Sequence, residues 1–145
     1  MSDDIELLDD GEQVTREHVQ ARVENWQSRI REFYSLIRAW AEKNDWKVND
    51  SGRVEMLEEL MQEYEIPPAE QPVLRLDRGA QFALFFPKGL WVIGANGRID
   101  LITPKGSFII VDLANQFAEP KWMIFRTEPN SKGKPFSPDM IESLM

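Results

Sequence analysis

The clearest pattern in the chain is a run of apolar residues that recur at alternating intervals of four and three positions. The run comprises Val19, Val23, Trp26, Ile30, Phe33, Ile37 and Trp40. An α-helix has 3.6 residues per turn, so this spacing places all seven side chains on one stripe of a helix. Thr15 is suited to cap that helix, and Glu17 lies in its first turn. The pattern predicts a helix of about 28 residues.

A stripe of this kind can form a coiled coil or can pack on a sheet. Coiled-coil dimers favour Leu at alternate positions of the seam, whereas two tryptophans and a phenylalanine occupy such positions here. We therefore expect the helix to pack on a sheet of the same chain.

A second, shorter helix is predicted over residues 53–65, after a short extended piece at Trp46 and Val48. Asp50 or Ser51 is suited to cap this helix. Prolines follow it and are expected to end it, because proline lacks the amide N–H that a helix interior needs. The apolar side expected to face the core consists of Val54, Leu57, Leu60, Met61 and Tyr64.

The rest of the chain is rich in β-branched and aromatic runs separated by turn residues, which is typical of strands. Strands are predicted at residues 73–78, 81–87, 90–95, 98–103, 108–113 and 121–126, and a short helix at residues 139–144. The predicted fold class is α+β: a long amphipathic N-terminal helix and a shorter helix packed on an antiparallel meander of about five to six strands, with a short C-terminal helix.

Two turns are expected to set the register of the meander. Asn96-Gly97 is a strong signal for a two-residue hairpin turn, and residues 103–106 suit a turn with proline second and glycine fourth. With these turns, Val92, Leu101 and Phe108 share one row, and Gly94, Ile99 and Ile110 share the next. The opposite face is also largely apolar, and we expect part of it to contact a partner through Trp91, Ile93, Arg98, Asp100, Ile102, Ile109 and Val111.

The net charge of −8 is unevenly distributed along the chain. The first twelve residues hold six carboxylates and no basic residue, which leaves −2 for the remainder. We interpret residues 1–13 as an acidic flexible tail and residues 14–145 as a single α+β domain. A nearly neutral body is a poor match to the phosphate backbone, so we do not expect a nucleic-acid partner.

The sequence also narrows the compartment and the cofactor chemistry. The chain contains no cysteine, its start is acidic where a secretory signal is basic, and no apolar run approaches the ~18 residues of a membrane span. We expect a cytoplasmic protein with no membrane partner. A zinc site needs several His or Cys ligands, and the segment 89–97 lacks the strand, loop and helix order of a phosphate-binding loop, so we expect no cofactor.

Candidate catalytic groups are few. The one histidine, His18, falls in the first turn of the long helix, where we expect a solvated surface residue. The carboxylates nearest the strands are Asp77, Asp100, Asp112 and Glu119, and their spacing predicts no particular site. Asp112 continues a core-facing row, and we expect it to sit beyond the end of the core. Arg98 and Asp100 alternate on one strand, where we expect a cross-strand or diagonal ion pair.

The function class that these observations favour is binding to another protein. Immunity proteins, antitoxins, inhibitors and adaptors act by occluding a partner, and an acidic surface complements a basic one. Two alternatives remain open. One is an enzyme or small-molecule binder with a carboxylate-containing pocket between helix and sheet. The other is a single-stranded nucleic-acid binder that stacks bases on the sheet aromatics Phe82, Phe85, Phe86, Trp91 and Trp122. Association of identical chains is also left open.

Overall fold

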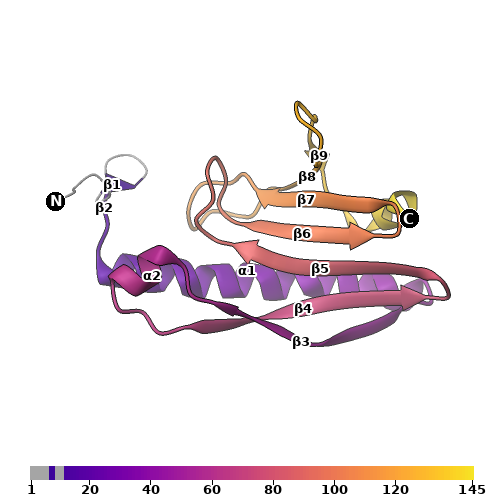
Figure 1. The fold of residues 1–145 in the computed structure, drawn as a ribbon, viewed down its shortest axis with the longest axis horizontal. Coiled ribbons are helices and arrows are strands. Elements are labelled where there is room, and N and C mark those ends of the chain that lie inside the picture. The colour runs from indigo at the N-terminus through magenta and orange to yellow at the C-terminus, as the bar shows by residue number, and fades with distance from the viewer. Residues whose placement is uncertain (1–6, 9–11) are drawn as a thin grey trace.

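The computed structural model describes residues 7–8 and 12–145, and it has the predicted α+β class. One long helix lies along one face of an antiparallel sheet, and short elements close its ends (Figure 1). The elements in chain order are β1 (Leu7–Leu8), β2 (Glu12–Gln13), α1 (Arg16–Lys43), β3 (Lys47–Met56), α2 (Glu59–Glu63), β4 (Ala69–Arg78), β5 (Gln81–Gly89), β6 (Arg98–Thr103), β7 (Gly106–Asp112), β8 (Trp122–Arg126), β9 (Lys134–Pro135) and the 3₁₀ helix η2 (Pro138–Leu144).

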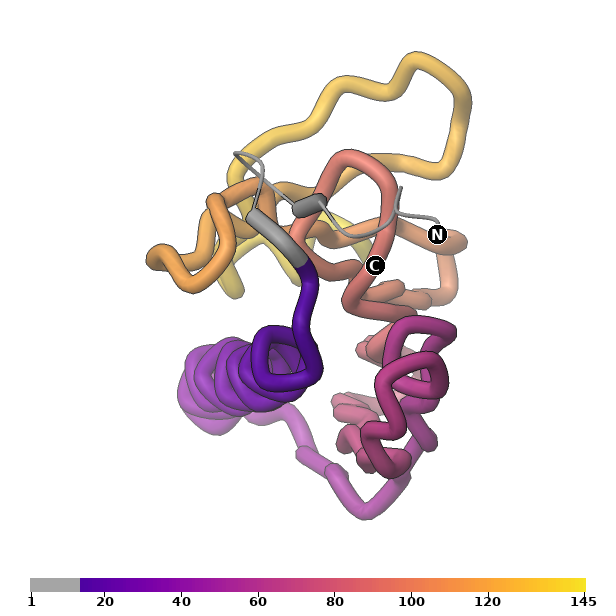
Figure 2. The backbone as a smooth tube through the Cα atoms, turned by 90° about the vertical axis from the view of Figure 1, so that its left-hand side faces the viewer, coloured from indigo at the N-terminus to yellow at the C-terminus, as the bar shows by residue number. Residues whose placement is uncertain are grey.

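The long helix is confirmed, including its start. The Thr15 side chain accepts a hydrogen bond from the backbone N–H of His18 at 3.1 Å, which caps α1. Six of the seven residues of the apolar stripe are buried, and Trp40 is partly buried. α1 lies beside the sheet (Figure 2), and the buried residues of the stripe share one core cluster with strand residues, so the preference for sheet packing over a coiled coil is confirmed within this chain.

The main sheet is a seven-stranded meander in the order β3-β4-β5-β6-β7-β8-β9, with every neighbouring pair antiparallel. Leu101 lies opposite Phe108, and Ile99 lies opposite Ile110, as the predicted register requires. Thr103 pairs with Gly106 across a two-residue connection, so the predicted turn at residues 103–106 is confirmed.

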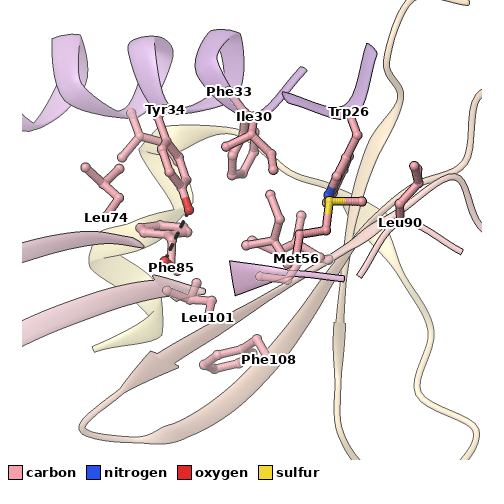
Figure 3. Close-up of a cluster of buried hydrophobic side chains, with 14 of the residues drawn as sticks. Trp26, Ile30, Phe33, Tyr34, Met56, Leu74, Phe85, Leu90, Leu101 and Phe108 are labelled. Atoms are coloured by element: carbon pink, nitrogen blue, oxygen red, sulfur yellow. Dashed lines mark hydrogen bonds between the residues drawn. The ribbon is translucent and has the colours of Figure 1, made fainter. Parts of the chain in front are cut away.

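The core lies between α1 and the inner face of the sheet (Figure 3). Side chains of α1 such as Ile30 and Phe33 meet strand residues such as Leu74 and Phe85, all of them buried. Buried apolar contact of this kind contributes about 25 cal/mol per Å². The Tyr34 hydroxyl donates to the carbonyl oxygens of Pro72 at 2.9 Å and Phe85 at 3.2 Å, and burial raises the pKa of Tyr34.

The helix predicted over residues 53–65 is wrong for most of its length. Residues 47–56 form β3, with a register shift between Asn49 and Gly52, and α2 covers only Glu59–Glu63. Asp50 and Ser51 lie within β3 and cap no helix. The apolar spacing there is compatible with both periods, and pairing with β4, which extends back to Ala69, decides in favour of a strand.

The strand predicted at residues 90–95 and the hairpin at Asn96-Gly97 are also wrong. β5 continues to Gly89 and pairs directly with β6, and residues 90–97 form a loop with one isolated bridge between Val92 and Ala95. A type I′ turn needs positive φ at both central residues, but Asn96 has none, whereas Gly97 has φ +117°. The predicted rows with Val92 and Gly94 in the core are therefore replaced by rows in which Phe85 faces Leu101 and Pro87 faces Ile99.

The C-terminal helix is confirmed as the 3₁₀ helix η2, which buries Ile141 and Leu144. The Thr103 hydroxyl donates to the carbonyl oxygen of Leu144 at 2.8 Å, and Arg78 forms an ion pair with Glu142 at 2.6 Å. That ion pair lowers the pKa of Glu142, because the guanidinium donates hydrogen bonds to its ionised carboxylate. These contacts hold the end of the chain against the end of the sheet.

Candidate functional site

The face of the sheet turned away from α1 carries an apolar surface, which we call the open face. Burial alternates along β5, β6, β7 and β8, because successive side chains point to opposite sides of a strand. The outward side chains are only partly buried, and α1, the one helix that runs along the described sheet, lies on the other side (Figure 2). The apolar residues of the open face are Phe82, Leu84, Phe86, Ile102, Ile109, Val111, Met123 and Phe125.

Two ion pairs lie within this face. Arg75 Nε lies 2.9 Å from Asp77 Oδ2, and Arg98 Nε lies 2.7 Å from Asp100 Oδ1. The guanidinium of Arg75 also lies 4.9 Å from the centre of the Phe82 ring. Hydrogen bonding to Asp77 raises the pKa of Arg75. Each of these two pairs carries no net charge.

The residues predicted to bind a partner fall in two places. Arg98, Asp100, Ile102, Ile109 and Val111 share the open face, since Asp100 lies opposite Ile109 and Arg98 opposite Val111. The other two, Trp91 and Ile93, lie in the loop between β5 and β6 rather than on a strand.

The loop that carries Trp91 is fastened at its start by Glu58. The Glu58 carboxylate accepts hydrogen bonds from the backbone N–H of Leu90 at 2.7 Å and of Trp91 at 3.2 Å. Leu90 is fully buried, so it anchors the loop in the core, while Ile93 is fully exposed at the tip. Trp91 is partly buried against α1, with the guanidinium carbon of Arg22 5.7 Å from its ring centre.

A pocket of about 530 Å³ opens between this loop and the loop that follows β7. Arg22 of α1, residues 91–96 and residues 113–116 line it. Both loops leave the same end of the sheet, close to the start of α1 (Figure 1). The pocket therefore combines a helix side chain with two connections that are far apart in the sequence.

A buried polar network lies next to this pocket. Arg29 Nη1 donates to Asp112 Oδ2 at 3.0 Å and to the carbonyl oxygen of Asn96 at 2.6 Å. The other oxygen of Asp112 accepts from the backbone N–H of Ala114 at 2.9 Å and of Lys121 at 2.8 Å. Burial lowers the pKa of Arg29 to about 10, and Asp112 opposes that shift, so Arg29 stays protonated at neutral pH.

The expectation that Asp112 sits beyond the end of the core is wrong, because Asp112 is fully buried. Its role in the described structure is to hold α1 to β7 and to order the loop after β7. The four candidate carboxylates do not converge: Asp77 and Asp100 pair with arginines of their own strands, and Glu119 lies exposed in a loop. No group of three potential metal-ligating side chains occurs within residues 12–145 or at residues 7–8.

His18 is more constrained than the expected solvated residue. It is half-buried, its Nε2 lies 2.9 Å from Gln116 Oε1, and its ring meets Phe117 edge-on at 5.9 Å. Sequence reasoning also missed Arg22 and Arg29. Arg22 and Arg29 each lie three or four positions from members of the apolar stripe, so both are neighbours of the stripe on the helix surface. This spacing could have indicated that they are partly buried.

Comparison of the chain with protein-family models, with curated proteins and with solved structures finds no match. In the part of the chain that the structure describes, no helix is both long enough and apolar enough to cross a bilayer.

Proposed function

We propose that this protein is a protein-binding domain whose open face receives a partner with an apolar contact surface. The observation that supports it is the open face itself, which gathers eight apolar side chains from the four adjacent strands β5 to β8. An antiparallel sheet with one face toward water normally carries polar residues there. A contiguous apolar patch is typical of an interaction site.

The net charge of the chain restricts the kind of partner that we propose. The two ion pairs on the open face add no net charge to it, while the whole chain carries −8. A second copy would bring another −8 into the complex, whereas a basic partner would be attracted to the chain at a distance. The proposed occupant is a separate protein with a neutral or basic surface around an apolar patch. Inhibitors, immunity proteins, antitoxins and adaptors act by covering a surface of their partner, and here the covered surface is the partner's apolar patch.

The test is a pair of matched variants that add the same charge at two apolar positions. Ile109→Glu places a carboxylate in the middle of the open face, and Leu36→Glu places one on the solvent side of α1, where Leu36 is 63% exposed. Each variant is immobilised and used to recover partners from an extract of the source cells. We expect one stoichiometric partner to bind wild type and Leu36→Glu alike, and to bind Ile109→Glu at least tenfold more weakly, because burying an unpaired charge opposes association.

Circular dichroism and thermal unfolding check that both variants fold. Val111→Thr changes the polarity of the face with little change in shape and serves as a second face variant. Equal recovery by wild type, Ile109→Glu and Val111→Thr would contradict the proposal. A wild-type homodimer that Ile109→Glu dissociates would contradict it too, because the occupant would then be a second copy.

A further inference from the structure

A second pocket, which we call the basic pocket, lies beside η2. It has a volume of about 600 Å³ and is lined by residues of β7, β8, β9, the connection from β8 to β9, and η2. That connection projects from the edge of the sheet (Figure 1). The apolar lining residues are Phe108, Ile124, Phe125, Met140 and Leu144. A cavity of this size with an apolar lining is typical of small-molecule sites.

The basic pocket concentrates positive charge in an acidic chain. Its charged lining residues are the cations Arg126, Lys132 and Lys134 and the carboxylate Glu128, so the lining carries +2 while the whole chain carries −8. At physiological salt, exposed charges act over about 8 Å. For a ligand inside the pocket, these neighbouring groups therefore outweigh the more distant carboxylates of the chain. The lining favours an anion.

The three cations are not neutralised by carboxylates in the described part of the chain. None of Arg126, Lys132 and Lys134 takes part in the ion pairs between described residues. The guanidinium carbon of Arg126 lies 5.6 Å from the centre of the Phe108 ring, so this cation is held next to the apolar lining. Exposed cations beside apolar side chains are suited to an anion that also brings an apolar group.

The connection from β8 to β9 is fixed against the sheet. The Ser131 hydroxyl oxygen accepts a hydrogen bond from the backbone N–H of Arg126 at 3.0 Å, and the backbone N–H of Ser131 donates to the carbonyl oxygen of Glu128 at 3.3 Å. Gly133 passes directly against the ring of Phe125, because a Cβ at this glycine would collide with that ring. These contacts order the pocket wall before a ligand binds, which lowers the entropic cost of binding.

We propose that the basic pocket binds a small amphipathic anion, in which an acidic group such as a carboxylate is joined to an aliphatic or aromatic body. Arg126, Lys132 and Lys134 hold the acidic group, and the apolar lining receives the body. Among the apolar residues of the open face, only Phe125 also lines this pocket. The two sites are therefore tested by separate variants.

The test uses anilinonaphthalene sulfonate, a fluorescent probe that is itself a small amphipathic anion and reports binding to apolar surface. The probe is added to the full chain, and octanoate, octan-1-ol and acetate are compared as competitors. We expect octanoate to displace the probe at roughly one tenth of the concentration that the other two need, because octan-1-ol lacks the charge and acetate lacks the apolar body. The advantage of octanoate over octan-1-ol should shrink at high salt, which screens the charges.

Two double variants with the same change in charge locate the acidic group of the ligand. The lysine double variant, Lys132→Gln with Lys134→Gln, removes two cations from the pocket, and Arg31→Gln with Lys88→Gln removes two exposed cations outside it. We expect roughly tenfold weaker binding of the probe and of octanoate to the first, and wild-type binding to the second. Ser143→Phe places a ring at an exposed lining position and should block the pocket. Circular dichroism and thermal unfolding check that each variant folds.

Ile109→Glu separates the basic pocket from the open face, because the probe also reports binding to other apolar surfaces. Octanoate binding that is retained in Ile109→Glu and weakened in the lysine double variant supports the pocket, whatever the recovery of a protein partner shows. The proposal is overturned if the lysine double variant binds octanoate as wild type does, if octan-1-ol competes as well as octanoate, or if Ile109→Glu alone removes binding.

Discussion

Gly97 shows how a single residue can be required for a reason that its sequence context does not reveal. Its φ of +117° lies in the region that L side chains rarely adopt, and a Cβ there would collide with the ring of Trp26. The sequence predicted a glycine-dependent hairpin turn at this position. In the structure the glycine is needed because the loop before β6 crosses directly over the core tryptophan.

Substitution of Gly97 tests that close approach. Gly97→Ala combines positive-φ strain with a clash against a buried ring, and we expect it to lower the free energy of unfolding by about 2–5 kcal/mol. Gly94 in the same loop is the matched control, because its φ is +81° but nothing lies within 4 Å of a Cβ built there. Gly94→Ala should cost about 1–2 kcal/mol. Urea unfolding measures both, and equal costs would show that backbone strain alone matters at Gly97.

The elements that the sequence predicted well are those whose burial repeats with one clear period. In α1 the apolar stripe marks the buried side, and in β6 and β7 the alternation of buried and outward residues matches the pleat. The same reasoning failed at residues 53–56, where the apolar positions fit a helix but the backbone pairs with β4. Long-range pairing decided that segment, and a local period contains no information about it.

A buried ion pair, which the sequence analysis did not predict, attaches α1 to β7. Asp112 ends β7 and pairs with Arg29 from the middle of α1, and both side chains are almost completely buried. The aspartate looked misplaced in a core-facing row because its partner is more than eighty positions away in the chain.

Neutralising Asp112 should therefore loosen the helix from the sheet. Asp112→Asn keeps an oxygen acceptor for the amides of Ala114 and Lys121 but leaves the buried charge of Arg29 without its counter-ion. We expect a loss of about 3–5 kcal/mol in the free energy of unfolding, as for other buried pairs that lose one partner. The control is Asp77→Asn in the exposed pair with Arg75, which should change stability little. A similarly small effect of Asp112→Asn would show that the backbone contacts alone hold this end of β7.

At the scale of the whole molecule, the candidate site was predicted in part. Five of the seven expected residues share the open face because the register of β6 and β7 followed from the turn between them. Trp91 and Ile93 were placed on the same face by a hairpin that does not form, and they line a pocket with Arg22 instead. That pocket joins a helix to two loops, and no local sequence signal specifies such a juxtaposition.

The open face also has a consequence for the behaviour of the whole chain in solution. The net charge of −8 keeps copies apart at neutral pH, but it approaches zero near the isoelectric point of about 4.7. Without mutual repulsion, the apolar open face should drive association of the chains. We expect light scattering to show reversible association of wild type near pH 4.7, reversed on return to pH 7. Leu36→Glu should associate as wild type does, whereas Ile109→Glu, with the same added charge on the face, should remain monomeric over a wider pH range. Identical association of the two variants would indicate that loss of net charge alone is responsible, and that the open face is not the contact surface.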